Sequence, residues 1–131
     1  MPANFKPIFP LSPVVGVANI SSAITTRTVT GVTGLTSVKA AGTNGTRVDR
    51  VRVNATATTT AGMIRLWLFS GTGNAQLRHE EPVTAVTPSA TVAGFTTEIV
   101  FPDLVLPSGW TLYASTHQAE AFNVFMHGGD Y

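Results

Sequence analysis

The sequence predicts an all-β protein that folds as a single β-sandwich of roughly eight strands with jelly-roll-like connections. β-Branched Val, Ile and Thr dominate from Val14 onward, and Gly, Asn and Pro interrupt them at short intervals. Turn signals about every 8–12 residues are typical of sandwiches and barrels. Helical periodicity is hard to find, and 131 residues suit one domain. An immunoglobulin-like sandwich and a barrel are the alternatives.

The first element is an extended, Pro-rich N-terminal arm. Each proline fixes φ, removes a backbone donor and biases the preceding residue toward extended backbone. We assign residues 1–22 to this arm and its lead-in, and residues 23–131 to the sandwich domain. Apolar side chains on the arm should pack on their own domain or on a neighbouring subunit, because such a set is seldom left in water. These side chains are Phe5, Ile8, Phe9 and Leu11.

Two strands are expected in the first half of the sandwich. Ala23 to Thr30 is rich in β-branched residues. In Arg47 to Val53 the valines alternate with arginines, as in a strand with one polar face. Val48 is out of phase with this alternation, which predicts a β-bulge near Asp49.

The next two strands are expected to form a hairpin. Met63 to Phe69 is apolar on both faces, which indicates either a central strand covered on both sides or a face in an oligomer contact. Ser70 to Asn74 supplies the small, φ-permissive residues of a hairpin turn. The following strand runs from Gln76 to Val86, and Pro82 places part of it at an edge or a bend.

The C-terminal part of the chain predicts three more strands. Thr91 to Phe101 is expected to end at Pro102. A turn at Pro107 to Gly109 then leads into Trp110 to Ser115, where apolar and polar residues alternate. The same alternation returns in Phe122 to His127, and we predict that these last two strands pair as a terminal hairpin.

Composition excludes several classes of partner. Charged residues make up 11% of the chain and the net charge is +1, so there is no electrostatic reason to expect nucleic acid or an acidic membrane as the main partner. No apolar run approaches the roughly 20 residues that cross a bilayer. The prolines also interrupt every apolar stretch near the N-terminus, so no signal peptide is expected. The chain contains no cysteine.

Catalysis and metal binding have little support in the sequence. No G-x-S-x-G elbow surrounds a serine, and His79 is followed by a glutamate that a strand would direct to its opposite face. His117 with Glu120 and His127 with Asp130 are i, i+3 pairs, a spacing that does not converge two ligands on a strand. We therefore predict no catalytic residues, no metal and no cofactor. A small enzyme would instead need two of the histidines to meet a carboxylate in one pocket.

Arginines are the most informative polar residues. Arg is planar, weakly hydrated and carries five donors, which suits interface ion pairs with carboxylates. Without a glycine-rich phosphate loop and with few lysines, the set falls short of a nucleic-acid footprint. We predict contacts to acidic groups of a partner by Arg47, Arg50 and Arg52, within a wider collection that includes Arg65 and Arg78.

Four aromatic residues leave a carbohydrate-binding module open. Flat aromatic rings form sugar-stacking platforms in such modules, although aromatic residues of this kind usually belong to the core. The four are Trp67, Trp110, Tyr113 and Phe125.

The end of the chain resembles a known class of virion proteins. Leu106 to Thr116, continuing through Glu120 to Val124 and Gly128 to Tyr131, is similar to the ending of small virion proteins of tailed bacteriophages, of the capsid cement or decoration type. The resemblance covers about the last fifth of the chain and carries turn and strand positions rather than a binding site.

This resemblance implies a structural function. Cement proteins are typically β-rich, often trimeric, and bind the outside of the expanded head where capsomers meet. The expected partners are the major capsid protein and further copies of the chain, in a homotrimer on the virion surface after synthesis in the host cytoplasm. A tail or neck component and a host-recognition or carbohydrate-binding module are the alternatives.

Overall fold

The computed structural model describes residues 10–131 and confirms an all-β sandwich, with no helix in this part of the chain. The predicted contact residues Phe5, Ile8 and Phe9 lie outside the described residues. The strands are β1 (Ser12–Ile20), β2 (Thr36–Ala40), β3 (Thr46–Ala55), β4 (Gly62–Phe69), β5 (Gln76–Val83), β6 (Thr96–Leu106), β7 (Thr111–Thr116) and β8 (Phe122–Asp130). β1 falls within the range 1–22 that the sequence assigned to the arm and its lead-in.

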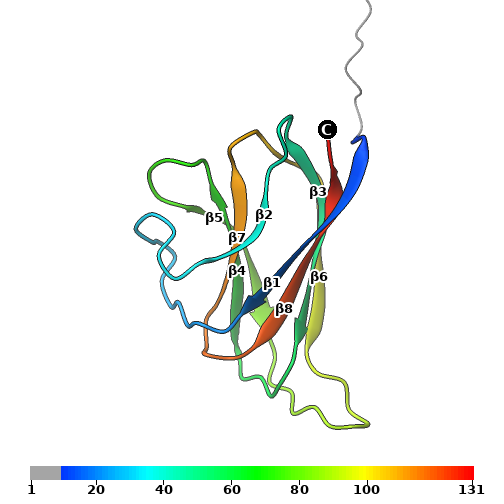
Figure 1. Cartoon of the computed structure of the whole chain (residues 1–131). Helices are drawn as coiled ribbons and strands as arrows, with labels where there is room; N and C mark the ends of the chain where they lie inside the picture. Colours follow the sequence, from blue (N-terminus) through cyan, green and yellow to red (C-terminus); the bar gives the residue numbers. More distant parts are fainter. Residues whose placement is uncertain (1–9) are drawn as a thin grey trace, which may run out of the picture.

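Two four-stranded antiparallel sheets face each other (Figure 1). Sheet A has the order β1-β8-β3-β6, and sheet B has the order β2-β7-β4-β5. Four antiparallel pairs are nested in the sequence: β1 with β8, β2 with β7, β3 with β6, and β4 with β5. The first half of the chain therefore pairs with the second half in reverse order, like one long hairpin folded over into two layers.

The core lies between the sheets and is built from alternate residues of the strands. On β8, Phe122, Val124 and Met126 point inward and are at most 1% exposed. Ile64 and Leu66 of β4 meet them from sheet B, within a single cluster of buried apolar side chains. Burial of apolar surface at about 25 cal/mol per Å² is the main source of stability for such a cluster.

β4 is a central strand, which was one of the two interpretations of Met63 to Phe69. It lies between β7 and β5 in sheet B, and both Leu66 on its inner face and Trp67 on its outer face are fully buried. The predicted turn from Ser70 to Asn74 connects β4 to β5, with positive φ at two of its glycines. The hairpin expectation for this region is confirmed.

The predicted terminal hairpin is wrong. β7 belongs to sheet B and β8 to sheet A, so residues 117–121 cross from one layer to the other. Alternation in a strand shows which side chains share a face, but it carries no information about the neighbouring strand. β7 and β8 instead pair with strands from the first half of the chain.

Two other expectations from the sequence differ from the structure. Ala23 to Thr30 forms no strand, and only an isolated bridge joins Ala23 to Thr116. The sequence analysis also did not anticipate β2. Thr is more common in the irregular segments of this chain than in its strands, so a Thr-rich composition does not identify a strand.

Prolines within strands lie at sheet edges, as expected. Pro82 is in β5, an edge strand of sheet B. Pro102 was expected to end its strand, but β6 continues to Leu106. β6 is an edge strand, and Pro102 lies opposite the β-bulge between Val48 and Arg50 of β3, where the ladder is already interrupted. This bulge is the one predicted near Asp49.

Candidate functional site

The three arginines predicted to contact a partner lie together on the outer face of sheet A. Arg50 and Arg52 alternate with Val51 and Val53, which are fully buried in the core. Arg47 lies on the same strand beyond the bulge. Because successive side chains of a strand point to opposite faces, burying the valines of β3 directs its arginines away from the core.

Exposed valines flank these arginines on both sides. The register places Val15 of β1, His127 of β8, Arg50 and Val100 of β6 in one row across the sheet. Val15 is 59% exposed and Val100 is 67% exposed.

The next row across the sheet contains Val17, Phe125, Arg52 and Glu98. Val105 of β6 is also exposed. We call the outward side chains of these four strands the A face.

Arginines and carboxylates lie close together on the A face. Arg50 and Arg52 both approach the single carboxylate of Glu98, at 3.8 and 3.6 Å. The Nε of Arg47 donates to Asp49 at 2.8 Å, and this hydrogen bond is the main cause of the raised pKa of Arg47. Asp103 of β6 is a third exposed carboxylate on this face, so three arginines and three carboxylates lie on it. Exposed ion pairs contribute little to stability, so these arginines remain available to a partner's carboxylates.

Leu11, the one predicted arm contact inside the described residues, lies just before β1. Its side chain is 66% exposed, and its backbone N–H donates to the carbonyl oxygen of Asp130 at 2.9 Å. Leu11 therefore lies at the end of sheet A where β8 finishes (Figure 1).

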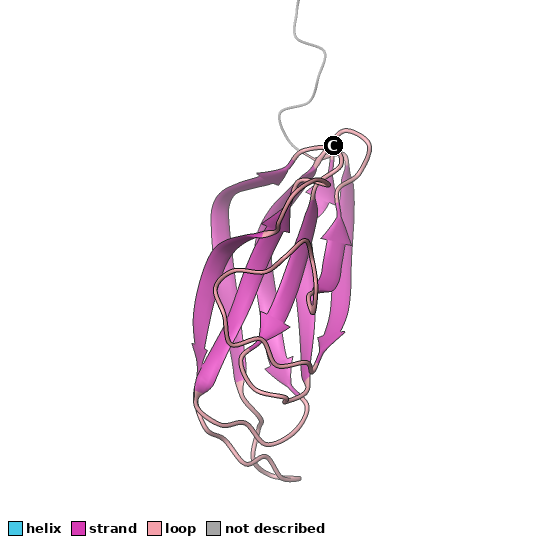
Figure 2. Ribbon diagram, turned by 90° about the vertical axis from the view of Figure 1, so that its left-hand side faces the viewer, coloured by secondary structure: helices cyan, strands magenta, loops and turns pink. Residues whose placement is uncertain are grey.

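The outer face of sheet B is covered by the chain itself. Residues 21–35, which connect β1 to β2, lie outside this sheet (Figures 1 and 2). The N–H of Ile24 donates to the carbonyl oxygen of Thr116 at 2.8 Å. The N–H of Ala75 donates to the carbonyl oxygen of Gly31. These bonds attach the segment to β7 at one point and to the β4–β5 connection at another.

Buried polar side chains lie beneath this segment. Arg65 is only 2% exposed; its Nε donates to Glu80 at 3.0 Å and its Nη1 donates to the carbonyl of Ile24 at 2.9 Å. Arg27 in the covering segment approaches the same Glu80 oxygen at 2.6 Å. The hydrogen bond from Arg65, followed by that from Arg27, lowers the pKa of Glu80. Arg65 therefore belongs to this covered face and not to the A face.

The three histidines lie on different parts of the sandwich. His79 of β5 contacts Glu81 at 2.9 Å and packs edge-on against Phe101. His117 follows β7, and His127 is on the A face. Within residues 10–131 no three His, Asp or Glu side chains are grouped to hold a metal ion.

The four aromatic residues do not form one platform. Trp67 is buried under the segment that covers sheet B, and its Nε1 donates to Ser115 at 2.9 Å. Tyr113 contacts Phe69 edge-on, while Trp110 packs against the core. Phe125 is on the A face.

Comparisons with family models, curated proteins and solved structures returned no match. No helix among residues 10–131 has the length and apolar character that crossing a membrane requires. The function must therefore be inferred from the two faces of the sandwich.

Proposed function

We propose that this protein is a structural virion protein, a capsid cement or decoration protein that binds the outside of a phage head through its A face. One observation carries the proposal: sheet B is covered by residues 21–35, whereas the A face exposes valines on both edge strands around three arginines. Exposed apolar side chains surrounding arginines are typical of the surfaces that proteins bury against one another.

We further propose that the sandwich is a jelly roll. The strand order and the four nested antiparallel pairs support this assignment, because a jelly roll consists of eight strands wound as two Greek keys in two sheets. Jelly rolls are used by viral capsid and lectin domains, so the fold agrees with a virion function without specifying one.

The proposed occupant of the A face is the major capsid protein. Arg50 and Arg52 share the single carboxylate of Glu98, so their remaining donors favour an acidic surface, and the valines favour apolar groups beside it. Cementing needs no reaction: a protein that binds the assembled shell and not its separated subunits stabilises the shell by mass action. A homotrimer, which the sequence resemblance implies, would engage several capsomers at once and multiply a modest affinity.

Binding to heads of the phage that encodes this chain tests the proposal. Heads stripped of the protein are mixed with the purified chain, and bound protein is measured after sedimentation. We expect Arg50→Glu to weaken binding at least about tenfold, because it adds a repulsive charge at the centre of the contact. Arg78→Glu is the matched control, since Arg78 is an exposed arginine on β5 of sheet B.

Each outcome of this experiment has a clear meaning. Absence of wild-type binding to heads overturns the cement proposal, and binding to purified tails instead supports a tail component. Equal losses for the Arg50 and Arg78 variants would show that the A face is not the contact. Sedimentation equilibrium of the free protein separately tests the trimer.

The arm provides a second contact in this proposal. Residues 1–9 carry Phe5, Ile8 and Phe9, which we propose clasp a neighbouring subunit or the shell. Deleting residues 1–9 leaves β1 intact and should lower the occupancy of heads. Undiminished occupancy would reject the clasp while leaving the contact through the A face in place.

A further inference from the structure

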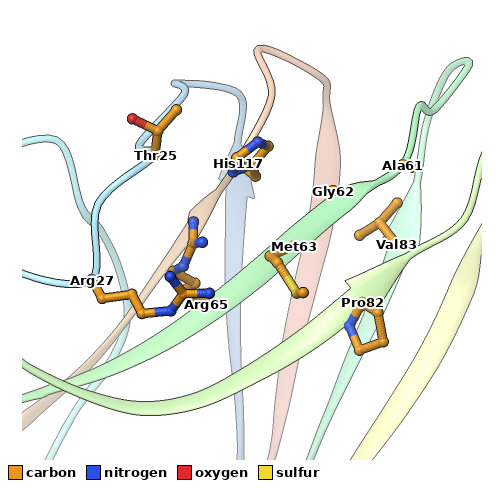
Figure 3. A pocket seen from close by; sticks show the side chains of 9 residues that line it. All are labelled: Thr25, Arg27, Ala61, Gly62, Met63, Arg65, Pro82, Val83 and His117. Atoms are coloured by element: carbon orange, nitrogen blue, oxygen red, sulfur yellow. The ribbon is translucent and has the colours of Figure 1, made fainter.

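A groove with charged and apolar walls lies on the outer side of sheet B, away from the A face (Figure 3). It is found where β4 begins and β5 and β7 end, and residues of the covering segment form one of its walls. Its volume is about 450 Å³, enough for a small organic molecule. The groove is lined by Thr25, Arg27, Ala61, Gly62, Met63, Arg65, Pro82, Val83 and His117.

One side of the groove is apolar. Met63 and Pro82 are register partners on β4 and β5, and Figure 3 shows Val83 and Ala61 beside them. No polar side chain comes from this wall. A ligand that fills the groove should therefore present an apolar group to β4 and β5.

The opposite side contains two guanidinium groups that share one carboxylate. Arg65 and Arg27 both bond to the same oxygen of Glu80. Arg65 also bonds to the Ile24 carbonyl through Nη1, and its Nη2 has no acceptor among the described residues. The side chain of Arg27 is 62% exposed, and only its Nε is paired. Guanidinium donors are therefore available at the groove.

His117 lines the groove beside the guanidinium groups. Its Nδ1 is inaccessible to solvent and has no hydrogen-bond partner among the described residues. The backbone N–H of His117 donates to the Met63 carbonyl at 2.8 Å, which fixes the residue against β4. An atom that solvent does not reach cannot donate to a ligand in an open groove, so Nδ1 is not one of the ligand's contacts.

We propose that this groove binds a carboxylate attached to a short branched apolar group. The carboxylate pairs with Arg27 and with the free Nη2 of Arg65, while the ring of His117 lines the groove beside it. The apolar group lies against Met63 and Pro82. This inference is independent of the proposed capsid contact, since the two surfaces are on different sheets.

The nearby acidic groups are already engaged. Glu80 accepts from both arginines, and the carboxylate of Glu120 accepts from the N–H and hydroxyl of Thr60 at 2.8 and 2.6 Å. A ligand carboxylate would therefore not compete with Glu80 or Glu120 for the free donors of the groove. Thr25 lies on the wall formed by the covering segment.

Nuclear magnetic resonance titration with 3-methylbutanoate tests the site on the full chain. The ring resonances of His117 are followed at constant pH and ionic strength, and a dissociation constant of the order of 1 mM is expected for so small a ligand. The uncharged 3-methylbutanamide has the same shape and should bind at least about tenfold more weakly. Acetate, which lacks the branched group, should also bind more weakly than 3-methylbutanoate.

Two variants locate the binding. Arg27→Gln should weaken 3-methylbutanoate binding about tenfold or more, while Arg50→Gln on the A face should leave it unchanged. Both arginines are largely exposed, so both variants should fold, which their amide spectra will show. Equal binding of the amide, equal losses in the two variants, or no saturable shift of His117 would each overturn the proposal.

Discussion

The buried pair of Trp67 and Ser115 gives the sharpest test of how the chain covers sheet B. Trp67 is fully buried and Ser115 is 1% exposed, and the indole Nε1–H donates to the hydroxyl at 2.9 Å. Ser115→Ala leaves the indole N–H without an acceptor, which costs about 2 kcal/mol. Trp67→Phe leaves the hydroxyl unpaired and also creates a small cavity, so its cost should be about 3 kcal/mol.

The double variant should be more stable than the sum of the two losses predicts. Removing both polar partners leaves nothing unsatisfied, so only the cavity cost and part of the lost bond remain. We expect a coupling energy of about 1–2 kcal/mol between the two substitutions. For a chain of 131 residues, each 1 kcal/mol shifts the melting temperature by about 4 °C, so Ser115→Ala should lower it by ~8 °C.

Calorimetry or thermal circular dichroism of the four proteins measures this coupling. Additive losses would refute the reasoning, because they would mean that each group finds water or another partner when the other is removed. That result would also mean that residues 21–35 do not exclude water from this face of sheet B.

Three other predictions concern a charge, a valine and a glycine. Because the pKa of Glu80 is lowered by folding, the ionised Glu80 side chain stabilises the fold above its ordinary pKa of 4.5. This stabilisation is lost as the pH falls through the lowered pKa. The melting temperatures of wild type and Glu80→Gln should therefore converge below pH 4.5. Val100→Thr should change stability by less than about 0.5 kcal/mol yet reduce binding to heads; a large change in melting temperature would contradict its exposure. Gly128→Ala should prevent folding or lower the melting temperature sharply, because the new Cβ would lie too close to the Arg47 carbonyl oxygen; a native-like spectrum and melting curve would contradict this.

Local patterns were sufficient to predict the properties of single strands. Valine–arginine alternation placed Arg50 and Arg52 on one face of β3, and the break at Val48 located the bulge. The two-sided apolar character of residues 63–69 identified a central strand. Each of these features depends on the two-residue period of a strand, which is visible in a window of a few residues.

Features set by distant parts of the chain were not predictable in this way. Residues 21–35 have a composition that suits a strand, yet the hydrogen bonds from Ile24 and from Arg65 hold them as an irregular cover on sheet B. The partner of β8 was also mistaken, since any alternating strand matches the pattern. The groove at His117 combines residues from four separate parts of the chain, so no motif in the sequence indicated it.

β1 shows why alternation left the exposed valines unrecognised. Its inward residues include Gly16 and Ala18, which are smaller than Val15 and Val17 on the outward side. Hydropathy alone would therefore assign the wrong face to the core. The structure explains the inward glycine: a Cβ at Gly16 would lie 2.5 Å from the carbonyl oxygen of Val38, because β1 approaches β2 closely where the two sheets meet.

The requirements of folding do not explain valines on the outward face of β1. Strand propensity favours β-branched residues, but threonine satisfies that preference equally and is compatible with water, as in the exposed Thr96 of β6. At Val15, Val17 and Val100 the chain has the apolar alternative instead, beside Arg50 and Arg52, which share the carboxylate of Glu98. On the other sheet the same protein uses its own residues 21–35 to shield Trp67 from water. The contrast between the covered face of sheet B and the exposed valines of the A face is the reason for proposing that another protein covers the A face.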